Sequence, residues 1–201
     1  QFQSQMNPHF VYNALHNIQG LVLTDEKQKA NRQIQSLAHL MRKTFANADK
    51  DDISLEEEIH YLNKYVEFEK TSFGNNLNFE VTVSKDAEGA QIPPMMIQPF
   101  IENAIKHAEL NKVENPHIKV LIETENNLLT INVIDNGTGI KKDITETDKL
   151  SHSLTVIKSR LDLLFKGRAD VNNQPVFLVK TMPEIREGTN IKFYLPLNYA
   201  Y

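Results

Sequence analysis

The chain has 201 residues, 40% of them hydrophobic, and a formal net charge of −4, which is typical of a globular protein with enough apolar material for one large domain or two small ones. It contains no cysteine, which excludes disulfide scaffolds, thiol nucleophiles and cysteine-ligated zinc. The slight acidity without a basic run argues against nucleic acid as a partner, and no stretch approaches the ~20 apolar residues of a membrane span.

The first predicted helix runs from Pro8 to Val22, with Asn7 as a cap and Pro8 at the first helical position. Its apolar residues repeat at helical spacing and form one stripe, made of Val11, Leu15, Ile18 and Val22 and flanked by Phe10, Ala14 and Leu21. Three polar residues project from the opposite side, namely His9, Asn13 and His16.

His9 lies in the first turn of this helix, close to the positive end of the helix dipole. That position favours the neutral imidazole, which is the nucleophilic form. On the helical pattern alone, an ordinary exposed histidine is the better interpretation.

A second amphipathic helix is predicted from Asn31 to Phe45, with an apolar side made of Ile34, Leu37, Ala38, Met41 and Phe45. A short polar connection joins the two helices, so we expect an antiparallel hairpin. A hairpin alone has too little core, and its open apolar side is therefore expected to meet a second copy in a dimeric four-helix bundle.

A third helix follows, and Ser54 and Glu57 form a capping box at its start. Its apolar face comprises Leu55, Ile59, Leu62, Val66 and Phe73, and Gly74 is well placed to end it. We place the domain boundary here, with a helical region over residues 1–73 and an α/β region over residues 74–201.

The second region alternates strands and helices, which predicts an α+β fold in which helices cover one face of a sheet. Pro99 is expected to kink the first turns of its first helix. The predicted elements are a strand with Leu77, Phe79, Val81 and Val83 alternating, a helix over Met95–Ala108, strands over His117–Thr124 and Leu128–Ile134, a helix over Leu154–Phe165, and strands over Val176–Lys180 and Asn190–Leu195.

Two groups of polar residues suggest a nucleotide site. Asn103, Lys106 and His107 fall on one helix face, and an amide oxygen, an ammonium and an imidazole together suit a magnesium ion and the phosphates it bridges. Downstream, Asp135 ends a strand and can accept a hydrogen bond from an exocyclic amine, while the two glycines after it permit tight turns beside a ligand. Taken singly, each of these residues is compatible with a solvated surface position, and a lone Asp-x-Gly-x-Gly motif is weak evidence for a nucleotide site.

The order of these motifs is specific. Pro99-Phe100-Ile101-Glu102-Asn103-Ala104-Ile105-Lys106-His107, then Asp135-Asn136-Gly137-Thr138-Gly139-Ile140, then Arg160-Leu161 and Gly188-Thr189 resemble the ATP-binding domain shared by histidine kinases, gyrase B, Hsp90 and MutL. With Asn7-Pro8-His9-Phe10-Val11-Tyr12-Asn13 upstream, nearly the whole chain resembles the sensor histidine kinases of the LytS-like group.

The resemblance implies roles for the polar residues of the first helix and of the helix around Asn103. His9 matches the phosphoacceptor, and Asn13 resembles the polar residue that orients water when a partner is dephosphorylated. Asn103 matches the magnesium-binding asparagine, and Lys106 and His107 match residues near the phosphates of ATP.

It also implies how adenine is read. Asp135 matches the carboxylate that reads the adenine amino group, Gly137 and Gly139 the glycines that shape the adenine pocket, and Thr189 a hydroxyl near that carboxylate. Glu102 matches the acid beside the asparagine, although its helical spacing to Lys106 also fits a simple ion pair.

The lid over the phosphates departs from the family pattern. The family's lid reads Gly-x-Gly-Leu followed by Asn, whereas this chain has Ser151-His152-Ser153-Leu154 with Val156 at the Asn position. Ser151 and Ser153 keep small side chains but not glycine-only backbone angles, and their hydroxyls can meet the phosphates together with the amides of the next helix. The residue after His9 is Phe10, so the adjacent acid of many other histidine kinases is absent, as it is in the LytS-like group.

The resemblance therefore implies autophosphorylation of His9 by Mg-ATP, followed by transfer to an aspartate of a response regulator, in a homodimer. The alternative is a degenerate kinase that acts as a dimeric signalling module without turnover. An ATPase clamp of the gyrase or MutL kind is disfavoured because Pro99 stands where those enzymes carry an acid. A zinc hydrolase is disfavoured because no pair of the seven histidines has ligand spacing with an acid between.

The nucleotide must reach a histidine on a separate bundle, so the domains have to move. The hinge candidates are the stretch Phe45–Ser54 and the chain near Gly74. Because the sequence begins without Met and inside a functional motif, we expect a cytoplasmic piece of a longer protein anchored in the bacterial inner membrane.

Overall fold

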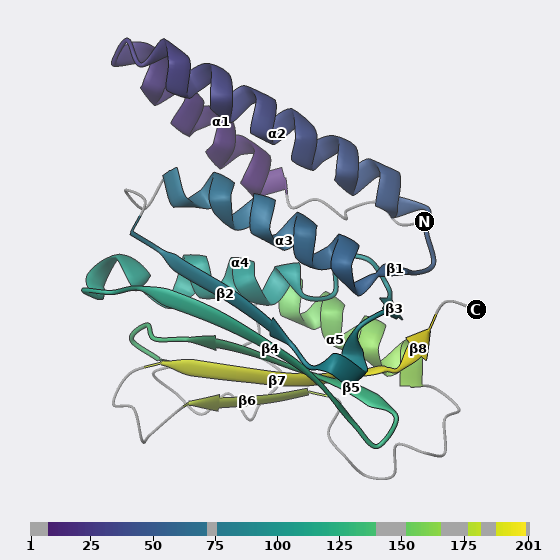
Figure 1. Ribbon diagram of the computed structural model, residues 1–201. Helices are drawn as coiled ribbons and strands as arrows, with labels where there is room; N and C mark the ends of the chain where they lie inside the picture. Colours follow the sequence, from purple (N-terminus) through teal and green to yellow (C-terminus); the bar gives the residue numbers. More distant parts are fainter. Residues whose placement is uncertain (1–7, 72–75, 140–151, 166–176, 182–187, 200–201) are drawn as a thin grey trace.

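The computed structural model describes residues 8–71, 76–139, 152–165, 177–181 and 188–199 (Figure 1). A helical hairpin lies on a third helix, and that helix in turn lies, with two more, on one face of a five-stranded sheet (Figure 1). The α+β fold and the sheet covered on one face are confirmed. None of the described helices is both long and apolar enough to cross a bilayer.

The helices match the predicted ones in order, and α1 and α5 match them in extent within two residues, whereas α2 begins four residues earlier and ends three residues later than predicted. α1 and α2 form the antiparallel hairpin, α3 lies beneath it, and α4 and α5 lie nearer the sheet (Figure 1). Their bounds are Pro8–Leu23 for α1, Lys27–Ala48 for α2, Leu55–Lys70 for α3, Gln98–His107 for α4 and His152–Phe165 for α5. Two short 3-10 turns cover Lys85–Ala87 and Leu110–Lys112.

The main sheet has the strand order β2-β4-β5-β7-β6. β2 pairs parallel with β4, and the other neighbours are antiparallel. A tight turn joins β4 to β5, because Asn126 and Asn127 both accept the left-handed backbone, with φ of 51° and 62°. The strands are β2 (Asn78–Val83), β4 (His117–Glu125), β5 (Leu128–Asp135), β6 (Phe177–Thr181) and β7 (Thr189–Pro196).

A second, three-stranded sheet was not predicted, because its strands are too short to show alternation. It consists of β1 (Ile53–Ser54), β3 (Ala90–Ile92) and β8 (Asn198–Tyr199). Ile53 pairs with Ile92, and both are fully buried. The chain is therefore joined to the α/β region before α3 begins.

The buried faces of the hairpin differ from the predicted apolar stripes. On α1, Leu15 and Val22 are 52% and 54% exposed, and the buried residues are Phe10, Ala14 and Ile18. On α2, Ile34 and Phe45 are 51% and 62% exposed, and the buried face carries Ala30, Gln33, Leu37, Leu40, Thr44 and Asn47. Each predicted stripe thus combines residues from a buried face and an exposed face of its helix. The reason is that α3 covers one side of the hairpin and leaves the other side exposed.

Polar pairs explain why α2 buries polar residues against α3. The hydroxyls of Thr44 and Tyr61 lie 3.1 Å apart, and the amide nitrogen of Gln33 donates to Thr71. Each buried polar group so paired avoids the cost of an unmet hydrogen bond. Tyr61 lies in the middle of α3 and Thr71 directly follows its last residue, so these two pairs hold α2 against the second half of α3.

The predicted cap of α3 is partly confirmed. The Ser54 hydroxyl accepts a hydrogen bond from the Glu57 N–H at 3.1 Å, and the helix ends at Lys70. Phe73, expected on the apolar face of this helix, Gly74, expected to end it, and Asn7, expected to cap α1, lie outside the described residues. The domain boundary after residue 73 stays a prediction.

Candidate nucleotide and phosphoacceptor site

α4 carries three of the predicted site residues. It begins at Gln98, three residues later than predicted, so Pro99 falls in its first turn and causes no kink. Asn103 and Lys106 are half-buried and His107 is exposed. The helix is held on the sheet by Phe100, whose ring stacks on that of Phe193 in β7 with centroids 4.3 Å apart.

Asp135 and Thr189 lie side by side at the ends of two neighbouring strands. They are register partners of β5 and β7, and each is 5% exposed. The carboxylate of Asp135 accepts the Gly137 N–H at 2.9 Å. Burial raises the pKa of Asp135, and its hydrogen bonds with the N–H groups of Gly137 and Thr189 oppose that rise. A carboxylate has about four acceptor positions, so this one can accept a further bond from a ligand amine.

The backbone after Asp135 packs directly on the end of α4. A Cβ atom on Gly137 would stand 2.0 Å from the carbonyl oxygen of Ala108, so no side chain fits there without moving the chain. The N–H of Thr138 donates to that same oxygen at 2.9 Å. This contact brings the Asp135 loop to the C-terminal end of α4, where Lys106 and His107 lie.

Two glycine backbones meet beside Asp135. Gly139 has φ of 72° and Gly188 has φ of 140°, a conformation that other residues rarely adopt. A Cβ on Gly188 would lie 2.5 Å from the carbonyl oxygen of Asp135. In the sequence, Gly188 stands out only as part of the motif Gly188-Thr189. Its positive φ, which requires a glycine at this position, cannot be read from the sequence.

Lys106 is engaged by carboxylates. It forms an ion pair with Glu102 one turn earlier on α4, as their spacing predicts, and it also interacts electrostatically with Glu69 of α3. Contact with a phosphate would require the ammonium to turn away from these two acids, so this cluster links α3 to the phosphate end of the site.

Glu69 gives this cluster a pH dependence. Burial, and secondarily the nearby charge of Glu102, raises the pKa of Glu69 from 4.5 to about 7, against the opposing charge of Lys106. The folded state therefore holds the proton more tightly than the unfolded chain, and the free energy of unfolding falls as pH rises from 4.5 to about 7, by roughly 3 kcal/mol.

Replacing Glu69 by Gln should remove that loss. We expect the unfolding free energy, measured with urea at pH 5 and pH 8, to depend less on pH in Glu69→Gln than in the wild type. Glu67→Gln, an exposed change on the same helix, serves as the control and should keep the wild-type dependence. Equal pH dependence in the wild type and Glu69→Gln would contradict the assignment.

His9 lies in the first turn of α1, and its neighbour Phe10 anchors that turn on α3. The Phe10 ring lies 5.4 Å, between centroids, from each of the rings of Tyr65 and Phe68, and Phe10 is only 4% exposed. Asn13, one turn after His9, is exposed. The first turn of α1 is thereby positioned by the helix that also carries Glu69.

The lid residues are described only in part. Ser151 lies outside the described residues, and Ser153 lies in the first turn of α5. The expectation that their hydroxyls meet the phosphates stays a prediction.

Glu58 was missed as a positioning residue for α4. It is 1% exposed, and its two carboxylate oxygens accept the N–H groups of Met95 at 3.0 Å and of Ile97 at 3.2 Å. Burial raises the pKa of Glu58, and these bonds and the charge of Arg160 oppose the rise. Ile97 is the N-cap of α4 and has no side-chain cap of its own, so Glu58 caps α4 from another helix.

A signal for both acids was present in the sequence. The buried face of α3 repeats at steps of three and four and includes two acids among apolar residues, in the series Leu55, Glu58, Leu62, Tyr65 and Glu69. A carboxylate on an apolar helix face needs a partner. Here the partners are backbone N–H groups in one case and a lysine in the other.

The donor set is suited to a nucleotide-bound magnesium ion. No group of three or more His, Asp or Glu residues that could hold a metal exists within the described part of the chain. Mg²⁺ bound to a nucleotide needs only one or two protein ligands, because phosphates and waters complete its shell. A single amide oxygen on α4, that of Asn103, fits that requirement.

Two family models match consecutive parts of the chain. Residues 1–77 match the model described as histidine kinase, and residues 90–199 match the model described as histidine kinase-, DNA gyrase B-, and HSP90-like ATPase. The chain is 33% identical to the sensor protein LytS of Staphylococcus epidermidis over 86% of this chain and 30% of that protein. It is 28% identical to LytS of Bacillus subtilis, over 97% and 33%. It thus spans about a third of the length of these relatives.

Solved structures share the fold. The histidine kinase domain of a blue-light activated kinase from Erythrobacter litoralis superposes with a TM-score of 0.55 at 16% identity, covering 84% of this chain and 74% of that one. The histidine kinase AdeS of Acinetobacter baumannii gives 0.53 at 13% identity, covering 94% and 98%.

Proposed function

Because this chain belongs to the histidine kinases, with an ATPase domain of the type shared with DNA gyrase B and HSP90, we propose that it transfers the γ-phosphoryl group of ATP to His9. One observation carries the proposal. Asp135 and Thr189 sit buried beside each other at the end of α4 that carries Lys106 and His107. A helix with a histidine in its first turn is packed onto the same body through Phe10.

The adenine end is formed by β5 and β7. The Asp135 carboxylate accepts a hydrogen bond from the amino group of adenine, and the Thr189 hydroxyl lies beside that carboxylate. Gly137 and Gly139 shape the adenine pocket, and the lack of a side chain on Gly137 lets the loop pack directly on Ala108 at the end of α4. A buried acceptor at this position forms a hydrogen bond with a base that has an amino group. It discriminates against a base that has a carbonyl group in the same place.

The phosphate end is formed by α4. Asn103 would hold the metal ion, Lys106 neutralises phosphate charge and His107 lies near the phosphates, with Ser151 and Ser153 contributing hydroxyls from the lid. A magnesium ion held by Asn103 would supply charge neutralisation at the phosphates. Phosphoryl transfer depends mainly on such positioning and neutralisation, so these residues need to do little covalent chemistry.

His9 is the nucleophile. A ring nitrogen of the neutral imidazole bonds to the γ-phosphorus, the bond from that phosphorus to the β-γ bridging oxygen breaks, and ADP leaves while the imidazole N–H proton passes to solvent. Asn13, one helical turn on, orients a water molecule when the phosphorylated partner is hydrolysed. The partner is a response regulator, whose aspartate takes the phosphoryl group from His9.

The hairpin is the dimerisation surface. Both helices expose large apolar side chains on the side away from α3, namely Tyr12, Leu15, Val22, Leu23, Ile34 and Phe45. An apolar surface of this kind in water favours association. A second hairpin would complete a four-helix bundle, and the parent protein would hold this cytoplasmic dimer at the bacterial inner membrane.

The test is incubation with γ-labelled ATP and magnesium. The wild type should acquire label that is labile in acid and stable in alkali, and His9→Gln should acquire none. His16→Gln, an exposed histidine on the same helix, is the matched control and should label like the wild type. Label that persists in His9→Gln would overturn the assignment of the nucleophile.

A further inference from the structure

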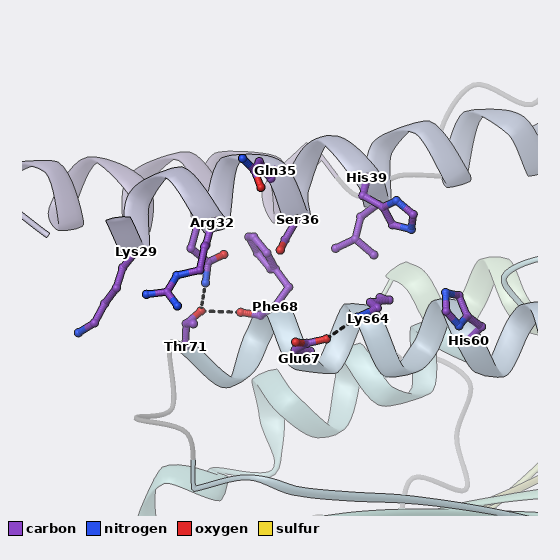
Figure 2. Close-up of a pocket in the computed structure, with 12 residues that line it drawn as sticks. Lys29, Arg32, Gln35, Ser36, His39, His60, Lys64, Glu67, Phe68 and Thr71 are labelled. Carbon is purple, nitrogen blue, oxygen red and sulfur yellow. Dashed lines mark hydrogen bonds and ion pairs between the residues drawn. The ribbon is translucent and has the colours of Figure 1, made fainter. Parts of the chain in front are cut away.

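A groove of about 630 Å³ separates α2 from α3 (Figure 2). None of the residues assigned above to the nucleotide or the phosphoacceptor lines it. Its volume is that of an ordinary small-molecule site. It therefore offers a second binding site that the proposed function does not use.

The groove is positively charged in an acidic protein. Three of its side chains, Lys29, Arg32 and Lys64, are permanent cations, and Glu67 is its one acid, while the whole chain carries a net charge of −4. Lys64 is paired with Glu67 at 2.9 Å, and Lys29 is paired with Glu26. Among the described residues Arg32 has no ion pair, so its guanidinium is available to a ligand.

Cationic and polar groups come from both walls. Figure 2 shows Arg32 and His39 reaching from α2 and His60 and Lys64 placed on α3. Arg32 on α2 carries a charge that is unpaired among the described residues, and Lys64 on α3 shares its charge with Glu67. An anion between the helices is therefore attracted chiefly by Arg32 and can take the place of Glu67 on Lys64. A guanidinium also binds phosphate through two parallel hydrogen bonds, which makes Arg32 the natural centre of such a site.

An unmet hydrogen bond lies in the same groove. Gln33 is 7% exposed, and its side-chain oxygen accepts no hydrogen bond from any described residue, while its amide nitrogen donates to Thr71. A buried acceptor without a partner destabilises the folded state. The oxygen itself is covered by neighbouring atoms, so a ligand hydroxyl supplies the missing donor by displacing them.

We propose that this groove binds a small phosphorylated polyol that carries at least two phosphate groups. Its phosphates contact Arg32 and Lys64, and a hydroxyl donates to Gln33. Because these contacts come from α2 and α3 together, the bound molecule holds the hairpin against α3. Since α3 is fastened to the ATPase region by Glu58, the ligand restrains the motion of the hairpin relative to that region.

The probe is fructose 1,6-bisphosphate, which combines two phosphates with hydroxyl donors and has no adenine. Its binding is measured by calorimetry on the full chain, without magnesium, for the wild type, the double variant Arg32→Gln/Lys64→Gln, and Arg42→Gln. Arg42 is an exposed arginine of α2 outside the groove. ATP binding with magnesium is measured on the same three proteins.

We expect the wild type and Arg42→Gln to bind the probe alike, more weakly as ionic strength rises, and the double variant to bind it at least about tenfold more weakly. ATP affinity should be equal in all three proteins. Equal probe binding by the wild type and the double variant would overturn the proposal. So would no binding to the wild type at millimolar probe, or a parallel loss of ATP affinity in the double variant.

Discussion

Asp135→Asn should weaken ATP binding about tenfold to hundredfold, the loss expected from one hydrogen bond to a charged acceptor. The amide keeps one oxygen to accept the Gly137 N–H, which Asp135 accepts at 2.9 Å. At the other position it offers an N–H₂ group where adenine also presents one. Inosine triphosphate has a carbonyl group at that place, so the substitution should weaken its binding less than that of ATP. The ratio of the affinity for ATP to the affinity for inosine triphosphate should therefore be smaller in Asp135→Asn than in the wild type.

Calorimetry with ATP and with inosine triphosphate measures both effects. Asp162→Asn is the control, because Asp162 is an exposed carboxylate on α5 and its replacement should change neither affinity. The fold should survive, since the substitution neutralises a buried charge without changing its shape. An unchanged ratio of the two affinities in Asp135→Asn would show that this carboxylate does not read the base.

Glu58→Ala should reduce the free energy of unfolding by about 3–5 kcal/mol, the range for removing one partner from a buried charged network. The alanine leaves the N–H groups of Met95 and Ile97 buried without the acceptors they have at 3.0 and 3.2 Å. Met95 also has φ of 59°, a conformation that the carboxylate helps to hold. ATP affinity should fall as well, because α4 loses its cap.

Urea unfolding measures the first effect. Glu67→Ala is the matched control on α3, where an exposed ion pair with Lys64 contributes less than about 1 kcal/mol. Glu58→Gln should lie between the two, because it keeps one acceptor oxygen. A Glu58→Ala variant as stable as Glu67→Ala would mean that the cap is not needed.

The extents of the helices and of the long strands could be predicted because their periodicities span many residues. The buried faces of α1 and α2 could not. The apolar residues of each helix serve two surfaces, one against α3 and one left open, and a single chain does not reveal which partner takes which face. Leu15 and Phe45 were therefore grouped with residues that prove to be buried, such as Ile18 and Leu37.

The polar residues of the candidate site could be proposed from the sequence because they lie together in short motifs. Asp135 and Thr189, predicted to be neighbours through resemblance alone, are cross-strand partners. Glu58 and Glu69 escaped notice because their partners are distant in sequence. The N–H groups that donate to Glu58 are 37 and 39 residues away. Because every residue except proline has a backbone N–H group, such a donor cannot be recognised from the residue type.

The pairing of Ile53 with Ile92 limits how far the ATP site can travel. α2 ends at Ala48 and β1 begins at Ile53, so the free tether is only residues 49–52, which span about 14 Å when fully extended. While β1 stays paired, the ATPase region can swing about the end of α2 but cannot drift away from it. Under the proposed function, the nucleotide therefore stays near the end of α2, and its γ-phosphate reaches His9 by rotation of the ATPase region rather than by diffusion.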